Sequence, residues 1–221
     1  MELQNPIPGY IFLITNDQQI KPLSQVDYDP ESGLVNCARK VFSPNFDDRP
    51  QGVTIDALII HAISLPPGEY GGKHVEKFFC NQLDSDAHPY FSEIAEIMVS
   101  SHFLINRSGE LVQFVPVNKR AWHAGVSSCM GRQAVNDFSI GIELEGCDDD
   151  GFEEAQYRVL AELSGLLIAA IPSLSTKHIY GHEDIAPGRK TDPGPGFDWH
   201  NYRLALLEQD LLIATKETES L

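Results

Sequence analysis

Residues 101–115 of the chain read SHFLINRSGELVQFV. Two candidate strands, 101–106 and 111–115, flank the turn-forming tetrapeptide Arg107-Ser108-Gly109-Glu110, and this spacing predicts a β-hairpin. A hairpin pairs its strands antiparallel, whereas strands and helices interleave along the rest of the chain. The sequence therefore predicts a single domain of the α/β class, α+β in type, with a central mixed β-sheet flanked by helices.

Two further strands are predicted on either side of the hairpin. Residues 57–63 form an apolar run rich in β-formers ahead of the turn-forming residues 65–68, which indicates a buried strand ending near His61. In residues 139–145 apolar side chains alternate with small and acidic ones. One face of that strand should therefore be apolar, while the other carries the carboxylates of Glu143 and Glu145.

Three helices are expected around these strands. Residues 90–99 have helical spacing and predict a short helix that covers the sheet through Phe91, Ile94, Ala95 and Met98. With the acidic run 148–150 at its N-terminus, a second helix should end before Pro172 and bury Val159, Leu160, Leu163, Leu167 and Ala170. The third runs from about Asp198 to Ala214, with Trp199, Leu206 and Leu207 facing inward.

The remaining segments are less regular. The first 50 residues predict irregular structure or one short strand pair. The polar run from Tyr70 to Pro89 predicts loop and short helix that could border a cleft, and residues 69–88 are the expected place for a mobile segment.

Composition narrows the classes of partner. With 221 residues and 42% hydrophobic content, the chain can bury one substantial core. A formal net charge of −16 argues against nucleic acid or an anionic membrane as the main partner. The sequence shows neither a secretory signal nor a membrane-spanning run, and four widely spaced cysteines suggest reduced thiols. We therefore expect a cytoplasmic monomer.

The loop at residues 181–194, GHEDIAPGRKTDPG, is the strongest chemical signal in the chain. Its turn-formers predict a surface loop held in one shape, and it carries an imidazole, carboxylates and an ammonium group. Catalytic zinc takes three protein ligands and leaves one position to water. His61, His182 and Asp192 would satisfy that count, although each alone is more often an ordinary structural residue.

Such a centre suits hydrolysis of an amide or ester. A carboxyl group near the metal could accept the proton of the attacking water and then protonate the leaving amine. Glu143 and Glu145 are both candidates, and their spacing does not choose between them. Lys190, two residues before Asp192, could stabilise the developing oxyanion.

Other histidines offer weaker alternatives. His178 and His182 are four residues apart, but Gly181 and the short segment after Pro172 argue against a helical metal-binding pair. Trp122 and His123 could line a cleft and stack on a sugar or peptide, or simply be buried.

Read together, four separated blocks resemble the zinc-dependent N-acetylmuramoyl-L-alanine amidases, and within them the cytosolic enzymes that act on 1,6-anhydro-muropeptides. The blocks are residues 58–68, 120–125, 136–146 and 181–194, and the resemblance runs from about Cys37 to Tyr202. It implies a fold related to phage amidases and peptidoglycan recognition proteins.

The same resemblance implies roles for particular residues. His61, His182 and Asp192 would hold one Zn²⁺, Glu143 rather than Glu145 would be the catalytic carboxylate, and Lys190 would stabilise the oxyanion. The implied reaction cuts the amide between the lactyl group of 1,6-anhydro-N-acetylmuramic acid and L-alanine, a step of peptidoglycan recycling. The substrate is thus a small-molecule anhydro-muropeptide.

The resemblance divides the chain into an N-terminal extension, residues 1–35, packed on a catalytic domain, residues 36–221. Three positions depart from the family pattern: Ala62, where Asn is common, and Met98 and Ala134, where Arg is usual. We expect Arg132 or Arg107 to take over the contacts of the missing arginines with peptide carboxylates.

Two other functions fit the same residues less well. A sensor that binds peptidoglycan fragments without cutting them would be expected to lack a metal ligand, and all three are present. A lytic amidase acting on intact wall would normally carry an export signal or a wall-binding module, and neither is visible in the sequence.

Overall fold

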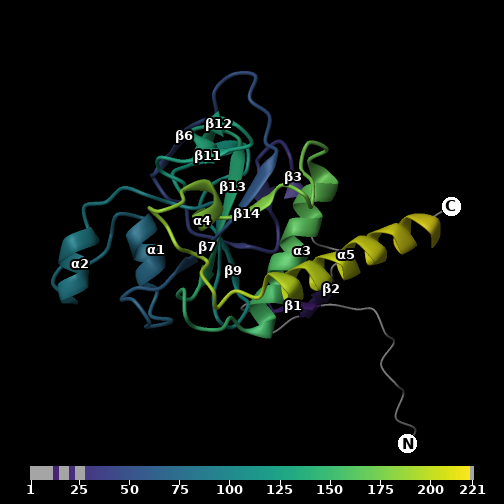
Figure 1. Ribbon diagram of the computed structural model, residues 1–221. Coiled ribbons are helices and arrows are strands. Elements are labelled where there is room, and N and C mark those ends of the chain that lie inside the picture. Colours follow the sequence, from purple (N-terminus) through teal and green to yellow (C-terminus); the bar gives the residue numbers. More distant parts are fainter. Residues whose placement is uncertain (1–11, 15–19, 23–27, 220–221) are drawn as a thin grey trace, which may run out of the picture.

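The computed structural model describes residues 12–14, 20–22 and 28–219. Its centre is a six-stranded sheet in the order β14-β7-β13-β8-β9-β5 (Figure 1). In that order the strands are Ile179–Gly181, Ala57–Ile63, Ser139–Glu145, Phe103–Ile105, Leu111–Gln113 and Arg39–Lys40. Strands β14, β7, β13 and β8 are parallel, β9 is antiparallel to β8, and β5 is parallel to β9. The predicted mixed sheet is confirmed.

Shorter elements surround this sheet. Four antiparallel pairs are β1–β2 (Phe12–Ile14, Ile20–Pro22), β3–β4 (Tyr28–Asp29, Leu34–Val35), β6–β10 (Phe46–Asp48, Lys119–Ala121) and β11–β12 (Ser128–Cys129, Arg132–Gln133). The helices are α1 (His74–Phe79), α2 (Pro89–Ile94), α3 (Glu154–Ala170), α4 (His182–Ile185), α5 (Trp199–Glu219) and the 3₁₀ helix η2 (Val135–Asp137). Across the described residues, no helix combines the length and apolar character needed to span a membrane.

The hairpin that predicted the mixed sheet forms between β8 and β9, with Ile105 opposite Leu111. Gly109 occupies the turn with φ +84°, a conformation that side chains with a Cβ rarely adopt. The side-chain oxygen of Asn106 accepts hydrogen bonds from the backbone N–H groups of Ser108 and Glu110. The turn is thus determined locally by the residues that signalled it.

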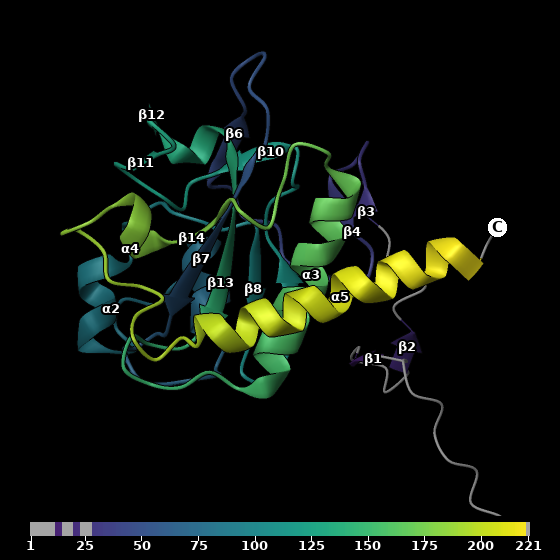
Figure 2. The same cartoon turned by 45° about the vertical axis from the view of Figure 1, so that its right-hand side comes forward.

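The two faces of the sheet have different roles. Ile140, Ile142 and Leu144 of β13 join the core packed beneath α3 and α5, which Figure 2 shows crossing one another on that side. The alternate residues of β13 and β7 point to the other face, where His61 and Glu143 lie. The predicted alternation is confirmed, but the polar face is buried as well.

Three predicted core positions are wrong. Leu207 is 57% exposed, because Trp199, Tyr202 and Leu206 already form the inward stripe of α5 and an adjacent residue points about 100° away. Met98 is 63% exposed, since α2 ends at Ile94 and helical spacing no longer applies beyond it. Ala170, the last residue of α3, is exposed.

Element boundaries also differ from expectation. Helix α3 begins at Glu154, and the acidic run 148–150 lies in the turn before it rather than in its first turn. Helix α5 extends to Glu219, five residues beyond the expected end. The first 50 residues form more strands than predicted, including β5 at the edge of the main sheet.

Candidate metal centre and active site

His61 and Glu143 lie side by side on neighbouring strands. The parallel register of β7 and β13 pairs His61 directly with Glu143. The sequence predicted His61 at the end of the strand, but it lies two residues before the end of β7. Its side chain is only 1% exposed. A lone buried imidazole is costly unless both ring nitrogens have partners, so its surroundings decide its role.

Strand β14 delivers the second histidine. It runs parallel to β7 and ends at Gly181, and the next residue, His182, begins α4. The predicted loop therefore contains one helical turn. The carboxylate of Asp184 accepts a hydrogen bond from the N–H of Gly181 at 2.8 Å and caps this turn.

The loop then folds back and brings Asp192 beside His182. The N–H of Glu183 donates to the carbonyl of Asp192 at 2.9 Å, which joins the two ends of the loop. Gly194 has φ +78°, and a Cβ there would lie 2.4 Å from the Cα of Asp148. The glycine therefore lets the returning chain pass close to the turn that precedes α3.

Three candidate ligand atoms meet at this point. The Nδ1 atoms of His61 and His182 are 2.9 Å apart, and Oδ2 of Asp192 lies 3.2 Å from the first and 3.1 Å from the second. Donors bound tetrahedrally to one Zn²⁺ are separated by roughly 3.3 Å, given bond lengths near 2.0–2.1 Å. The three groups predicted from sequence therefore come together in an arrangement that fits one zinc ion.

Glu143 is buried in the wall of the cavity that the three candidate ligands share. It is 8% exposed, and within the described part of the chain its Oε2 has no hydrogen-bond partner. Burial raises the pKa of Glu143 well above its usual value, the charge of Asp192 raises it further, and Lys190 opposes the shift. A carboxyl group with a free oxygen and a raised pKa suits a general acid and base.

Glu145, the alternative carboxylate, is already engaged. Its side chain accepts hydrogen bonds from the backbone N–H groups of Gly71 and Arg107. It thereby fastens the loop before α1 and the β8–β9 hairpin to the end of β13. Structure and resemblance thus agree in separating the two carboxylates.

A cavity of about 340 Å³ opens over these groups and contains His61, Glu143, His182, Lys190 and Asp192 in its lining. Its other wall is largely apolar and includes Phe78 and Phe79 of the predicted cleft-bordering segment, with Tyr90 and Ile94 of α2. A wider groove of about 1140 Å³ continues past Trp122 and Lys190 and is lined by Arg120 and Arg189. The polar groups thus lie where the cavity meets the wider groove, and both spaces could hold parts of a ligand.

His123 is the residue whose place the sequence did not indicate. The sequence left open whether it lines a cleft or is buried. It is 8% exposed, contributes to the lining of both the cavity and the groove, and its Nδ1 lies 2.9 Å from Nε2 of His61. Trp122 does line both the cavity and the groove. The alternative pair of His178 and His182 does not form, because β14 lies between them and His178 contacts the carbonyl of Asp56.

The three departures from the family pattern lie around the open space. Ala62 lines the cavity, and Met98 and Ala134 line the groove. Arg132 and Arg107, the expected substitutes, do not line either space. Arg132 pairs with Asp56 at 2.7 Å, and Arg107 pairs with Glu153 at 2.6 Å. The expectation that one of them replaces the missing arginines therefore gains no support from the structure.

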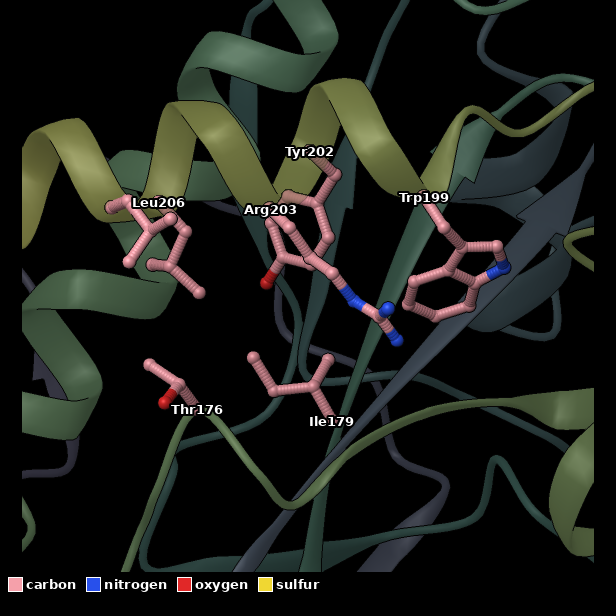
Figure 3. A pocket seen from close by; sticks show the side chains of 7 residues that line it. Thr176, Ile179, Trp199, Tyr202, Arg203 and Leu206 are labelled. Atoms are coloured by element: carbon pink, nitrogen blue, oxygen red, sulfur yellow. The ribbon is translucent and has the colours of Figure 1, made fainter.

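A second cavity, of about 200 Å³, lies between α5 and the segment before β14 (Figure 3). Its lining is mostly apolar, with Trp199, Tyr202, Leu206 and Ile179 around the guanidinium of Arg203. It contains no imidazole, thiol or carboxylate, so it lacks the groups that hydrolysis requires.

Comparisons with known proteins agree with this geometry. The profile of the family described as N-acetylmuramoyl-L-alanine amidase matches residues 51–195. The 1,6-anhydro-N-acetylmuramyl-L-alanine amidase AmpD of Escherichia coli K12 is 51% identical over 179 residues, which cover 81% of this chain and 97% of that protein.

Solved structures show the same likeness. A crystal structure of an AmpD derivative superposes with a TM-score of 0.77 at 51% identity, covering 79% of this chain and 97% of the other. The amidase AmiD of E. coli, in complex with the substrate anhydro-N-acetylmuramic acid-L-Ala-D-γ-Glu-L-Lys, has a TM-score of 0.51 at 27% identity, covering 73% and 65%. By its sequence and its fold, the chain belongs to the N-acetylmuramoyl-L-alanine amidase family.

Proposed function

We propose that the chain is a zinc-dependent hydrolase that cuts the amide between the lactyl group of 1,6-anhydro-N-acetylmuramic acid and L-alanine of the stem peptide. The relatives' names and the substrate held by AmiD support the substrate class. The observation that carries the proposal is the meeting of His61, His182 and Asp192 in one cavity with Glu143 and Lys190. The reaction would serve peptidoglycan recycling.

The residues of the site divide the work. A bound zinc ion, held by His61, His182 and Asp192, would supply Lewis-acid activation. Glu143 accepts the proton of the attacking water through its free Oε2 and returns it to the amine of L-alanine as the C–N bond breaks. Lys190 presents its ammonium group to the oxyanion of the tetrahedral intermediate, where the interaction is stronger than with the ground-state carbonyl.

Release of anhydro-N-acetylmuramic acid from anhydro-muropeptide tests this function. We expect activity in the zinc-loaded protein, loss of activity after exhaustive chelation and its return when Zn²⁺ is added. Full activity after complete zinc removal, verified by elemental analysis, would overturn the proposal. Binding of the substrate without release of product would instead indicate a sensor.

We also propose the division into an extension, residues 1–35, and a catalytic domain, residues 36–221. In support, β5 already belongs to the main sheet, and Val35 and Tyr28 pack against the core beneath α3. Residues 1–11 lie outside the described part of the chain.

A monomer in the cytoplasm is the remaining part of the proposal. Among the described residues no disulfide links any two of the four cysteines, which is compatible with a reducing compartment. Cell fractionation and light scattering of the purified chain test location and oligomeric state.

A further inference from the structure

We propose that His123 is a positioning residue that sets the tautomer of His61, so that the Nδ1 lone pair of His61 faces the metal site. This inference rests on the metal centre proposed above. It follows from a chain of hydrogen bonds that starts at a backbone carbonyl and ends at the candidate ligand atom.

Ser139 determines which atom donates and which accepts in each of these hydrogen bonds. Its hydroxyl oxygen lies 2.6 Å from the carbonyl oxygen of Val135 and 3.1 Å from Nε2 of His123. A carbonyl oxygen only accepts, so the hydroxyl proton of Ser139 must lie on the Val135 side. The oxygen of Ser139 then accepts a hydrogen bond, and Nε2 of His123 is the donor.

The tautomer of His123 in turn determines which atom donates in its hydrogen bond with His61. His123 is buried and contacts no carboxylate among the described residues, so its ring carries a single proton, the one on Nε2. Its Nδ1 therefore has a lone pair and accepts from Nε2–H of His61 at 2.9 Å. The Nδ1 of His61 is left without a proton and faces His182 and Asp192.

The neighbouring residue, Ala124, orients the other imidazole. Nε2 of His182 lies 3.2 Å from the carbonyl oxygen of Ala124, a closer partner than the Arg189 guanidinium at 3.5 Å, so the proton is on Nε2 and Nδ1 is bare. The side-chain oxygen of Asn136 accepts hydrogen bonds from the N–H groups of both His123 and Ala124. The dipeptide His123-Ala124, held by Asn136, thus determines the tautomers of both His61 and His182.

At the candidate metal site, three ligand atoms therefore present lone pairs and none of them carries a proton. Two bare Nδ1 atoms and a carboxylate oxygen lie 2.9–3.2 Å apart, an arrangement that repels unless a cation lies among them. The hydrogen bonds that His61 and His182 make on the side away from the metal site therefore hold both rings in the tautomer that can bind a metal.

Gly141 of β13 makes room for the His123 ring. A Cβ at this position would lie 2.5 Å from Cγ and 2.7 Å from Nδ1 of His123. The ring lies directly against the strand that also carries Ser139 and Glu143. Its position is thus determined by the sheet as well as by the two hydrogen bonds.

Zinc affinity, measured by competition with a chelator, tests the proposal with three variants of the full chain. His123→Leu removes the acceptor for His61, and we expect affinity to fall about 10- to 100-fold, the usual cost of losing such a support. In His123→Asn the side-chain oxygen occupies the place of Nδ1, so most of the affinity should return. His178→Leu, which removes an imidazole outside the chain of hydrogen bonds, should bind zinc like the wild type.

A second measurement holds even if His123→Leu does not fold. Long-range ¹H–¹⁵N correlation spectra of the zinc-loaded wild-type protein report the tautomer of each ring. We expect His123 to be protonated on Nε2 and bare on Nδ1.

Protonation of His123 on Nδ1 would overturn the proposal, and so would a folded His123→Leu variant with wild-type affinity. If the wild type itself binds no zinc, the proposed metal centre fails first, and that result is distinct from either of these.

Discussion

At the scale of single residues, the proposed mechanism separates metal binding from proton transfer. Glu143 is not one of the three candidate ligands, whereas His182 is. In Glu143→Gln we expect turnover to fall about 10²- to 10⁴-fold with one zinc retained. In His182→Ala the metal should be lost together with activity. Elemental analysis beside product release measures both, and equal zinc loss in the two variants would contradict this division of roles.

Lys190 is proposed to act only as the reaction proceeds, when the oxyanion forms. In Lys190→Met we expect kcat to fall about 10²- to 10³-fold while KM changes little, because the ammonium group acts on the oxyanion rather than on the bound substrate. Lys177→Met, which alters an exposed lysine, is the matched control and should behave like the wild type. A rise in KM at constant kcat would show that Lys190 binds substrate instead.

At the scale of elements, β13 carries two carboxylates two residues apart, of which Glu143 lines the cavity and Glu145 accepts hydrogen bonds from two loops. Glu145 holds the backbone N–H groups of Gly71 and Arg107, and it lies beyond the cavity lining. Glu145→Ala should therefore lower the free energy of unfolding by about 1–3 kcal/mol, since two backbone N–H groups lose a buried, charged acceptor. Zinc content should be unchanged. Thermal unfolding checks the loss, and an unchanged melting temperature would show that Glu145 does not fasten these loops.

At the scale of the whole molecule, Glu162 of α3 makes stability depend on pH. It is 4% exposed, neither carboxylate oxygen has a hydrogen-bond partner in the described ranges, and burial raises its pKa to about 7. Below the unfolded pKa of about 4.5 both states are protonated and the fold keeps its full stability. As pH rises toward 7 the unfolded carboxyl ionises first, so stability is lost by on the order of 3 kcal/mol.

Denaturant unfolding between pH 4.5 and 8 measures this loss. Glu162→Gln has no ionisable group at this position, and its stability should fall less over the same range than that of the wild type. Identical pH profiles for the two proteins would show that Glu162 is not the source of the dependence.

Local sequence was sufficient wherever a pattern repeats along one element. The hairpin at Gly109 and the alternation of residues 139–145 were predictable because turn chemistry and side-chain period act between near neighbours. The same reasoning failed at Leu207 and Met98. Their burial depends on which side of a helix meets its neighbour and on where that helix stops.

The sequence by itself determined the mixed sheet, the loop at residues 181–194 and the residue types of a zinc hydrolase. Only the tertiary structure decided that His61, His182 and Asp192 meet, that Glu145 is engaged while Oε2 of Glu143 has no partner among the described residues, and that His123 lies against His61. The reason is distance along the chain. These contacts join segments up to 131 residues apart, and strand order and register bring them together.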